Sequence, residues 1–196
     1  MYLERKKLSS DLSDDEINIL SNGSISADSF FYKSIGFNAN RLELAIKNMI
    51  NETKSDFYLP NFIKQGDEII GFFFAYPIEE LQYRELVSLK SIIHFSKRDL
   101  AIKKKLRAIA NLKPNITREN CLYLSRIYVN SDIRNSGVGS FMIKQLKEIS
   151  IELCLPFVSL HCHSSNKRAL KFYTNQGFKV VNKIDKGYFY LESKRL

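Results

Sequence analysis

The chain has 196 residues, of which 44% are hydrophobic and 26% charged, an ordinary composition for a globular protein that excludes extensive disorder. This length predicts a single domain, residues 1–196, with a core that needs no disulfide or metal to be stable. Lys and Arg outnumber Asp and Glu by 30 to 21. Residues 1–96 carry ten basic and fourteen acidic side chains, whereas residues 97–196 carry twenty and seven. This asymmetry indicates that the second half meets an anion: nucleic acid, a phosphorylated cofactor or a membrane.

Cysteine usage and hydropathy indicate the cellular compartment in which the protein works. Cys121, Cys154 and Cys162 form no CxxC pair, which is typical of a reduced cytoplasmic protein rather than of a disulfide framework. The charge-rich first sixteen residues do not resemble a signal peptide. The longest apolar runs are far shorter than the ~20 residues that cross a bilayer. We therefore expect a cytoplasmic protein that does not contact a membrane.

The first predicted elements are two helices and two strands. Ser13 and Glu16 have the spacing of a capping box, which predicts a short helix to about Ser21, ended by Gly23. A second amphipathic helix is predicted by apolar residues at helical spacing: Leu42, Ala45, Ile46, Met49 and Ile50. Residues 57–63 and 68–76 then predict two strands, the second apolar almost throughout and ended by Pro77.

Residues 79–112 predict a helical insertion, because they carry helical apolar stripes and are longer than the usual connection of about 2–6 residues. Six basic residues crowd into positions 97–107 of this segment. They form either a solvated helix face or a surface for RNA or an acidic acceptor. Phe95 is the one aromatic residue close by, so the base-stacking pattern of a nucleic-acid surface is weak.

The rest of the chain alternates between strands and helices. Strands are predicted at 121–129, 157–162, 178–181 and 188–192, with helices at 137–153 and 166–175. This alternation predicts an α/β sheet flanked by helices.

A glycine-containing turn lies between the strand 121–129 and the helix that follows it. Its sequence, Arg134-Asn-Ser-Gly137-Val-Gly139, lets the backbone approach a ligand closely, and the free N–H groups of the first helical turn favour an anion. Met142 occupies the third glycine position of a dinucleotide-binding fingerprint, and no Gly-Lys-Ser/Thr of a Walker A loop follows. The alternatives are a pyrophosphate-binding turn and an ordinary tight turn.

Two motifs in this order resemble the GNAT superfamily of N-acetyltransferases. The turn resembles its acyl-CoA motif R/Q-x-x-G-x-G/A, and Asn166 to Phe178 resembles its N-x-x-A-x-x-x-Y-x-x-x-G-F element. The resemblance is close over residues 121–181 and looser over 57–76. It implies the GNAT fold, a mixed, twisted sheet flanked by helices, here with the helical insertion near 79–112.

The resemblance also implies a cofactor site in the splay between strands 121–129 and 157–162. Acetyl-CoA would be the co-substrate, and no metal is expected. The backbone groups that would pair with the pantetheine arm belong to Ile127, Tyr128 and Val129. The N–H groups that would hold the pyrophosphate are those of Asn135, Ser136, Gly137, Val138, Gly139 and Ser140. Arg134 would stand at the entrance of the turn, and Asn166 would hydrogen-bond the pantetheine arm.

The implied activity is transfer of an acetyl group to a primary amine by direct attack in a ternary complex. Tyr173 would act as general acid on the leaving thiolate, a role that a positioned phenol can fill; the alternative is a half-buried tyrosine that only packs. The acceptor is not identified: a small-molecule amine, a protein amine and an aminoacyl-tRNA stay open, as does a homodimer.

The chain departs from the family pattern at the general base, because strand 122–129 carries no carboxylate. The candidates for this role are Glu79, Glu80, Glu85, His163 and a water chain near Ser125. The missing carboxylate keeps a second hypothesis open, a catalytically inactive GNAT-like module that binds CoA or nucleic acid. His161 and His163 lack a third ligand nearby in sequence, so we interpret them as ordinary strand-end residues rather than as a metal site.

Overall fold

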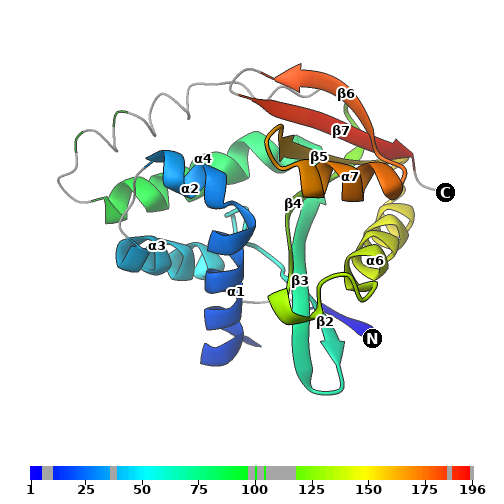
Figure 1. Cartoon of the computed structure of the whole chain (residues 1–196). Helices are drawn as coiled ribbons and strands as arrows, with labels where there is room; N and C mark the ends of the chain where they lie inside the picture. The colour runs from blue at the N-terminus through cyan, green and yellow to red at the C-terminus, as the bar shows by residue number, and fades with distance from the viewer. Residues whose placement is uncertain are drawn as a thin grey trace.

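The structure is a computed structural model that describes residues 1–5, 11–35, 39–96, 100, 104, 118–184 and 187–194 (Figure 1). Its helices are α1 (Asp14–Ala27), α2 (Ser29–Ile35), α3 (Ala39–Asn51), α4 (Leu81–Phe95), α6 (Val138–Glu152) and α7 (Lys167–Asn175). Its strands are β1 (Tyr2–Arg5), β2 (Asn61–Gln65), β3 (Glu68–Pro77), β4 (Cys121–Val129), β5 (Phe157–His163), β6 (Lys179–Ile184) and β7 (Tyr188–Lys194).

The strands form one seven-stranded sheet in the order β1-β2-β3-β4-β5-β7-β6. β4 and β5 are parallel, and the other neighbouring pairs are antiparallel. In Figure 1, β3 stands upright whereas β6 and β7 cross the top of the molecule at a steep angle, so the sheet is strongly twisted. The predicted mixed, twisted sheet is confirmed.

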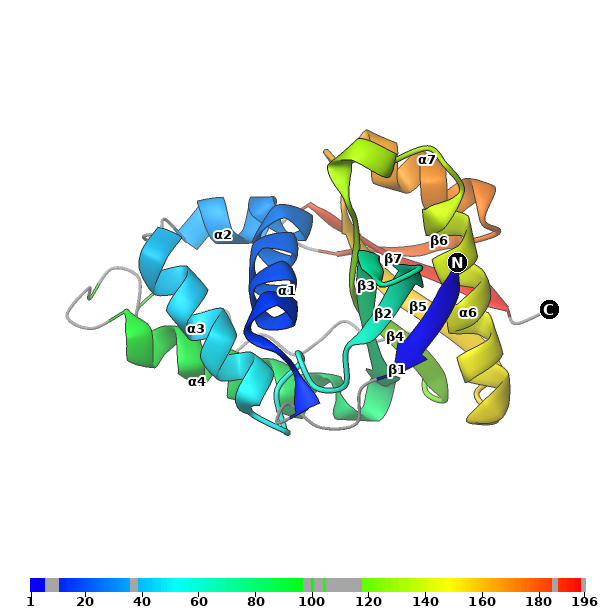
Figure 2. The ribbon, with the colours of Figure 1, turned by 90° about the horizontal axis from the view of Figure 1, so that it is seen from below.

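Helices cover both faces of the sheet, as Figure 2 shows, with α1 to α4 on one face and α6 and α7 on the other. The helices α1 to α4 enclose one apolar cluster that includes Leu20, Phe72 and Phe74. A second cluster includes Phe73 and Met142 and lies against α6 and α7. Because successive side chains of β3 enter opposite clusters, this strand is apolar almost throughout, as the sequence predicts.

A β-bulge in β4 changes which side chains face each layer. Leu124 lies opposite Ala75 and Arg126 opposite Phe74, so Ser125 has no residue of β3 opposite it. Tyr123 and Arg126 therefore point to the α1–α4 face, although three positions separate them in the chain. Bulges re-aim side chains in this way and are frequent beside active sites.

The first helix is longer than predicted. Its capping box is confirmed, since the Ser13 Oγ accepts from the N–H of Glu16 at 3.3 Å and a Glu16 carboxylate oxygen accepts from the N–H of Ser13 at 2.9 Å. The prediction that Gly23 ends the helix is wrong. A Cβ at Gly23 would lie 2.5 Å from the Phe72 ring, so this glycine is a packing position where α1 crosses the sheet closely.

The predicted insertion begins with helix α4. Residues 97–99, 101–103 and 105–117 lie outside the described residues, and with them most of the basic cluster. Within it, Lys104 is described and exposed. Across the described residues, no helix is both long enough and apolar enough to cross a bilayer.

Candidate active site

The parallel strands β4 and β5 separate halfway along their length. Their pairing runs from Cys121 opposite Phe157 to Leu124 opposite Leu160 and stops there. Beyond this point β4 still pairs with β3, and β5 still pairs with β7. The result is an opening in the sheet, bordered by residues 125–129 on one side and 161–163 on the other. An extended ligand can lie in it and bond to the free backbone edge of β4.

The turn after β4 leads directly to the start of α6. Asn135 and Gly137 have positive φ values of 70° and 89°. Among the described residues, none of the N–H groups from Asn135 to Ser140 donates to the protein; the next donor is Phe141, to the carbonyl of Gly137 at 3.0 Å. A Cβ at Gly137 would meet nothing within 4 Å, so the space over the turn is open. The turn therefore presents a row of free N–H groups at a helix N-terminus, as an anion site requires.

The two glycines of the motif have different tasks. Gly137 provides the left-handed backbone conformation at the N-cap of α6. Gly139 has an ordinary conformation, but a Cβ there would lie 3.1 Å from the Phe172 ring. Its task is to let α7 pack closely against α6, which keeps the residues of α7 near the opening.

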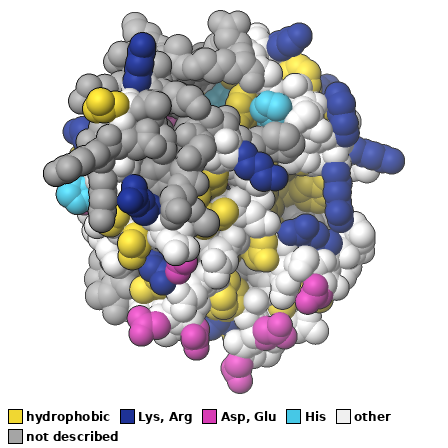
Figure 3. All heavy atoms as spheres, turned by 60° about the vertical axis from the view of Figure 1, so that its left-hand side comes forward, with side chains coloured by type: hydrophobic (Ala, Val, Ile, Leu, Met, Phe, Trp, Pro, Cys, Tyr) yellow, Lys and Arg dark blue, Asp and Glu magenta, His cyan; other side chains and the backbone are white. Residues whose placement is uncertain are grey.

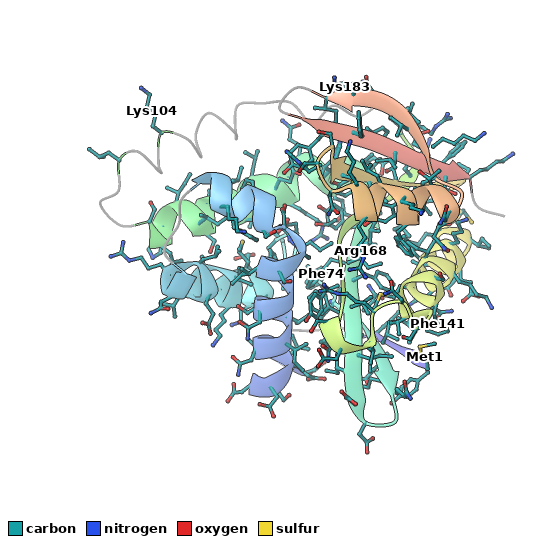
Figure 4. All side chains as sticks on the ribbon, viewed as in Figure 1. Met1, Phe74, Lys104, Phe141, Arg168 and Lys183 are labelled. Atoms are coloured by element: carbon teal, nitrogen blue, oxygen red, sulfur yellow. The ribbon has the colours of Figure 1, made fainter. Side chains whose placement is uncertain are left out.

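Two arginines hold the turn in place. The Nε of Arg134 donates to the carbonyl of Val129 at 3.1 Å. An Nη of Arg168 on α7 donates to the Oδ1 of Asn135 at 3.1 Å, and Figure 4 shows Arg168 near this turn. Both residues are exposed and add positive charge beside the free N–H groups. The sequence analysis missed Arg168 as a site residue, because its link to the turn spans 33 positions.

Asn166 is the N-cap of α7. Its Oδ1 accepts from the N–H of Ala169 at 3.1 Å, which satisfies one of the free donors at the start of the helix. Its Nδ2 donates to no group that the structure describes, and the residue is partly exposed. The predicted bond to a pantetheine arm stays a prediction, and it would use this nitrogen.

Tyr173 lies on the face of the sheet that α6 and α7 cover. It is 8% exposed and packs between Phe172 and Phe178, with ring centroids 5.3 and 5.7 Å away. Burial, with the nearby Cys162 as a smaller cause, raises the pKa of its phenol. Cys162 belongs to the part of β5 beyond the last pair with β4, so Tyr173 lies beside the opening.

A cluster of acidic side chains, here called the acidic cluster, lies on the opposite face of the sheet, beneath α1 to α4; it consists of Asp28, Asp56 and Glu85 with Arg126. Arg126 of β4 donates to the Asp56 carboxylate at 2.5 Å, and both side chains are at least 90% buried. Ser88 donates to the other oxygen of Asp56. Asp28 follows α1, and Glu85 comes from α4. Burial, followed by the charge of Asp56, raises the pKa of Glu85 to about 7, and burial also raises the pKa of Asp28.

The contacts of Glu79, Glu80 and Glu85 distinguish these three candidates for the general base. Glu79 accepts from the N–H of Asn120 at 2.8 Å, and Glu80 pairs with Arg84 at 2.5 Å, so both serve other contacts. Glu85, by contrast, has a pKa of about 7, close to neutrality.

The histidines and cysteines take ordinary roles. The Nδ1 of His161 lies 2.8 Å from the Tyr123 hydroxyl, and the Nδ1 of His163 lies 2.7 Å from the Ser165 hydroxyl. Within the described residues, no three His, Cys, Asp or Glu side chains gather as a metal site would require. Burial raises the pKa of Cys121 and of Cys162 to about 11, which makes both thiols poor nucleophiles.

Sequence reasoning missed Asp28, Asp56 and Arg126. The signal that could have found them is Arg126 itself, an arginine within the apolar run of a predicted central strand. A buried charge requires a buried partner, so this residue calls for a carboxylate elsewhere in the chain.

Comparison with known proteins agrees with this geometry. Residues 26–178 match the model of the acetyltransferase (GNAT) family. An N-acetyltransferase from Staphylococcus aureus superposes with a TM-score of 0.64 at 14% identity over 97% of this chain and 99% of that one. PaiA N-acetyltransferase from Thermoplasma acidophilum, in complex with coenzyme A, gives 0.56 at 18% identity over 99% of each chain. A Bacillus subtilis acetyltransferase in complex with CoA gives 0.56 at 13% identity over 99% and 98%. The predicted fold is confirmed, and the chain belongs to the GNAT acetyltransferase family.

Proposed function

We propose that the protein transfers an acetyl group from acetyl-CoA to a primary amine, by direct attack in a ternary complex. The observation that carries this proposal is the continuity of one path, in which the free N–H groups before α6 lead to the open edge of β4 and then to Tyr173. A molecule with a pyrophosphate at the turn and an extended arm along β4 would bring its end close to the Tyr173 phenol. The three free cysteines fit a reducing compartment, and we place the reaction in the cytoplasm.

The turn and β4 fit such a cofactor. The N–H groups of residues 135–140 would receive the pyrophosphate, with Arg134 and Arg168 adding positive charge. The backbone of residues 127–129 would pair with the pantetheine arm, and the Nδ2 of Asn166 would donate to it. Acetyl-CoA supplies a thioester, whose carbonyl carbon accepts an amine nucleophile.

In the proposed mechanism Tyr173 protonates the leaving sulfur. Its raised pKa keeps the phenol protonated at neutral pH, so the proton is available when the carbon–sulfur bond breaks. A thiolate released in the same apolar surroundings would also be more basic than in water, as the neighbouring Cys162 illustrates with its pKa of about 11. Burial therefore keeps the phenol protonated and makes the released thiolate a stronger proton acceptor than it would be in water.

The test is thiol release from acetyl-CoA by the full chain with a panel of primary amines, with products detected by mass. We expect amine-dependent release, and we expect Tyr173→Phe to lower kcat by about 10²–10⁴-fold while the Kd of CoA stays the same. If CoA binds but no amine stimulates release, the protein is a CoA-binding module and the proposal fails. Unchanged turnover in Tyr173→Phe would remove the general-acid role alone.

A further inference from the structure

Three carboxylates interact electrostatically with one guanidinium on the α1–α4 face of the opening. Asp28, Asp56 and Glu85 come from three separate parts of the N-terminal half, and Arg126 lies among them. Asp56 is the direct partner of Arg126, at 2.5 Å. Three acids to one base leave this acidic cluster with excess negative charge when all four groups are ionised.

Two hydroxyl groups buried beside the acidic cluster have no close hydrogen-bond partner in the part of the chain that the structure describes. Tyr32 and Tyr76 are each 4% exposed, and among the described residues neither hydroxyl has a partner at normal hydrogen-bond distance, although Arg126 lies near Tyr32 and Ser125 near Tyr76. Burial raises the pKa of both phenols, and the charges of Asp28 and Asp56 add to this for Tyr32, as Asp56 and Glu85 do for Tyr76. The Nε of Arg126 is also buried without a partner. A buried polar group left unsatisfied costs about 1–3 kcal/mol, so these atoms indicate a polar ligand that the cluster receives.

The acidic cluster borders the opening in the sheet. Arg126 is the second residue of β4 beyond the last pair with β5. Across the opening, His163 of β5 lies close enough to Asp28 to influence its pKa, and Asp28 in turn influences Tyr188 of β7. Tyr173 approaches from the other face of the sheet. A thioester in the opening would thus have its leaving-group acid on one side and the acidic cluster on the other.

We propose that the acidic cluster binds the ammonium group of the acceptor, and that Glu85 accepts its proton before attack. This inference rests on the proposed acetyl transfer. One N–H proton passes to the Glu85 carboxylate and later to solvent, and the nitrogen lone pair forms a bond to the thioester carbon. The carbon–sulfur bond breaks as sulfur takes the Tyr173 proton. A second N–H proton restores the phenol, so the products are an amide, a thiol and one released proton.

The substrate class that follows is a small primary alkylamine that is cationic at neutral pH. The unpartnered Tyr32 and Tyr76 hydroxyls would accept two of its N–H groups, and Asp28 would balance its charge. A carboxylate next to the amine would meet three acidic side chains, so α-amino acids are disfavoured. An arylamine, neutral at pH 7, would not gain from the negative charge.

The pH dependence of turnover distinguishes this base from simple deprotonation in solution. The charged groups that face Glu85 are Asp56, Asp28 and Arg126, with the Tyr76 and Tyr123 phenols next to it. With Glu85 as base, kcat/KM rises through about pH 7 and then stays level until the free amine loses its proton at a pKa of about 10. Without it, kcat/KM keeps rising until the amine itself loses its proton, at a pKa of about 10 for an alkylamine.

Matched amines test the substrate class. Butylamine is compared with norvaline, which adds a carboxylate to the same chain, and benzylamine is compared with the less basic aniline. We expect kcat/KM to be roughly ten- to hundredfold higher for the first member of each pair. Equal values within both pairs, or a preference for norvaline or aniline, would overturn the inference while acetyl transfer itself stands.

Variants test the proton acceptor. Glu85→Gln should abolish the rise near pH 7, and Glu85→Asp, which keeps a carboxylate, should restore part of it. Glu43→Gln, which removes an exposed carboxylate paired with Lys47, is the control and should keep the wild-type profile. A wild-type profile in Glu85→Gln contradicts the role.

Binding measured without turnover separates the two proposals. In calorimetry on protein saturated with CoA, benzylamine should bind and benzyl alcohol should not, and Asp28→Asn should weaken benzylamine binding. Selective binding without acetylation would leave the site standing and refute the proposed function. Equal binding of the amine and the alcohol would refute the ammonium site.

Discussion

The raised pKa of Glu85 makes the stability of the fold depend on pH. Burial raises this pKa from 4.5 to about 7, so the folded protein holds the proton more tightly than the unfolded chain does. The stability that comes from the protonated side chain is fully present below about pH 4.5 and is lost as pH rises through about 7. Ionisation of Glu85 next to Asp56 and Asp28 therefore destabilises the fold. A residue that acts as a base must be ionised, so this role lowers stability.

Glu85→Gln should remove that cost. We expect the free energy of unfolding at pH 8 to rise by about 1–3 kcal/mol relative to wild type, with no gain at pH 4. Urea unfolding at the two pH values measures the difference, and Glu43→Gln should change neither value by more than about 0.5 kcal/mol. A shift of the same size at both pH values would point to packing rather than ionisation.

Sequence predicts site residues where the chemistry is local in the chain. Motif spacing predicts Gly137, Asn166 and Tyr173 as site residues, and the structure packs α7, which carries Tyr173 and is capped by Asn166, against the turn and the start of α6; their roles stay predictions. The pair of Asp56 and Arg126 spans 70 positions, and no periodicity or spacing connects its members. Such a pair depends on tertiary packing, which a single sequence does not contain.

Helices and strands are predicted correctly where the hydrophobic pattern and the boundary residues agree. β4 has the predicted bounds, and α6 begins at the predicted glycine turn. The strand β1 and the helix α2 were not predicted. β1 has four residues and is fixed by its register with β2, and α2 has seven residues, both too short for a clear period.

Substitutions at the start of helix α7 can separate the N-cap role of Asn166 from its proposed hydrogen bond to CoA. Asn166→Ala should lower the free energy of unfolding by about 1 kcal/mol, because the N-cap is lost, and should also weaken CoA binding. Asn166→Ser keeps a capping oxygen but lacks the Nδ2 donor, so it should weaken CoA binding at nearly wild-type stability. Thermal unfolding and calorimetric Kd values measure both effects. Wild-type affinity in the serine variant would limit Asn166 to its cap.

Charge is distributed over the whole molecule in a way that the net value hides. Acidic side chains gather where α1 begins and the β2–β3 hairpin turns, along the lower rim of Figure 3. They line a groove of about 930 Å³ and include Asp11, Asp15, Glu16, Asp67 and Glu68. The exposed basic residues Lys167, Arg168 and Lys171 lie instead on α7, which packs against the glycine-containing turn before α6.

This separation predicts different salt responses for the two substrates. Raising NaCl from about 0.05 to about 0.5 M should increase the KM of acetyl-CoA several-fold, because exposed charges are screened. The KM of butylamine should change less, because Asp56 and Arg126 are buried and Asp28 and Glu85 are partly buried, so salt screens the acidic cluster less. Arg168→Gln should reduce the salt dependence for acetyl-CoA, whereas Lys179→Gln on β6 should not. Equal salt dependence for both substrates would contradict this assignment.

The opening between β4 and β5 makes half of β4 an edge inside the sheet. Amides of residues 125–129 that point away from β3 have no strand to protect them. In the free protein these amides should exchange with deuterium much faster than those of residues 121–124, and saturating CoA should slow them selectively. CoA would then complete part of the sheet. The free energy of local opening of β4 would increase with the concentration of CoA.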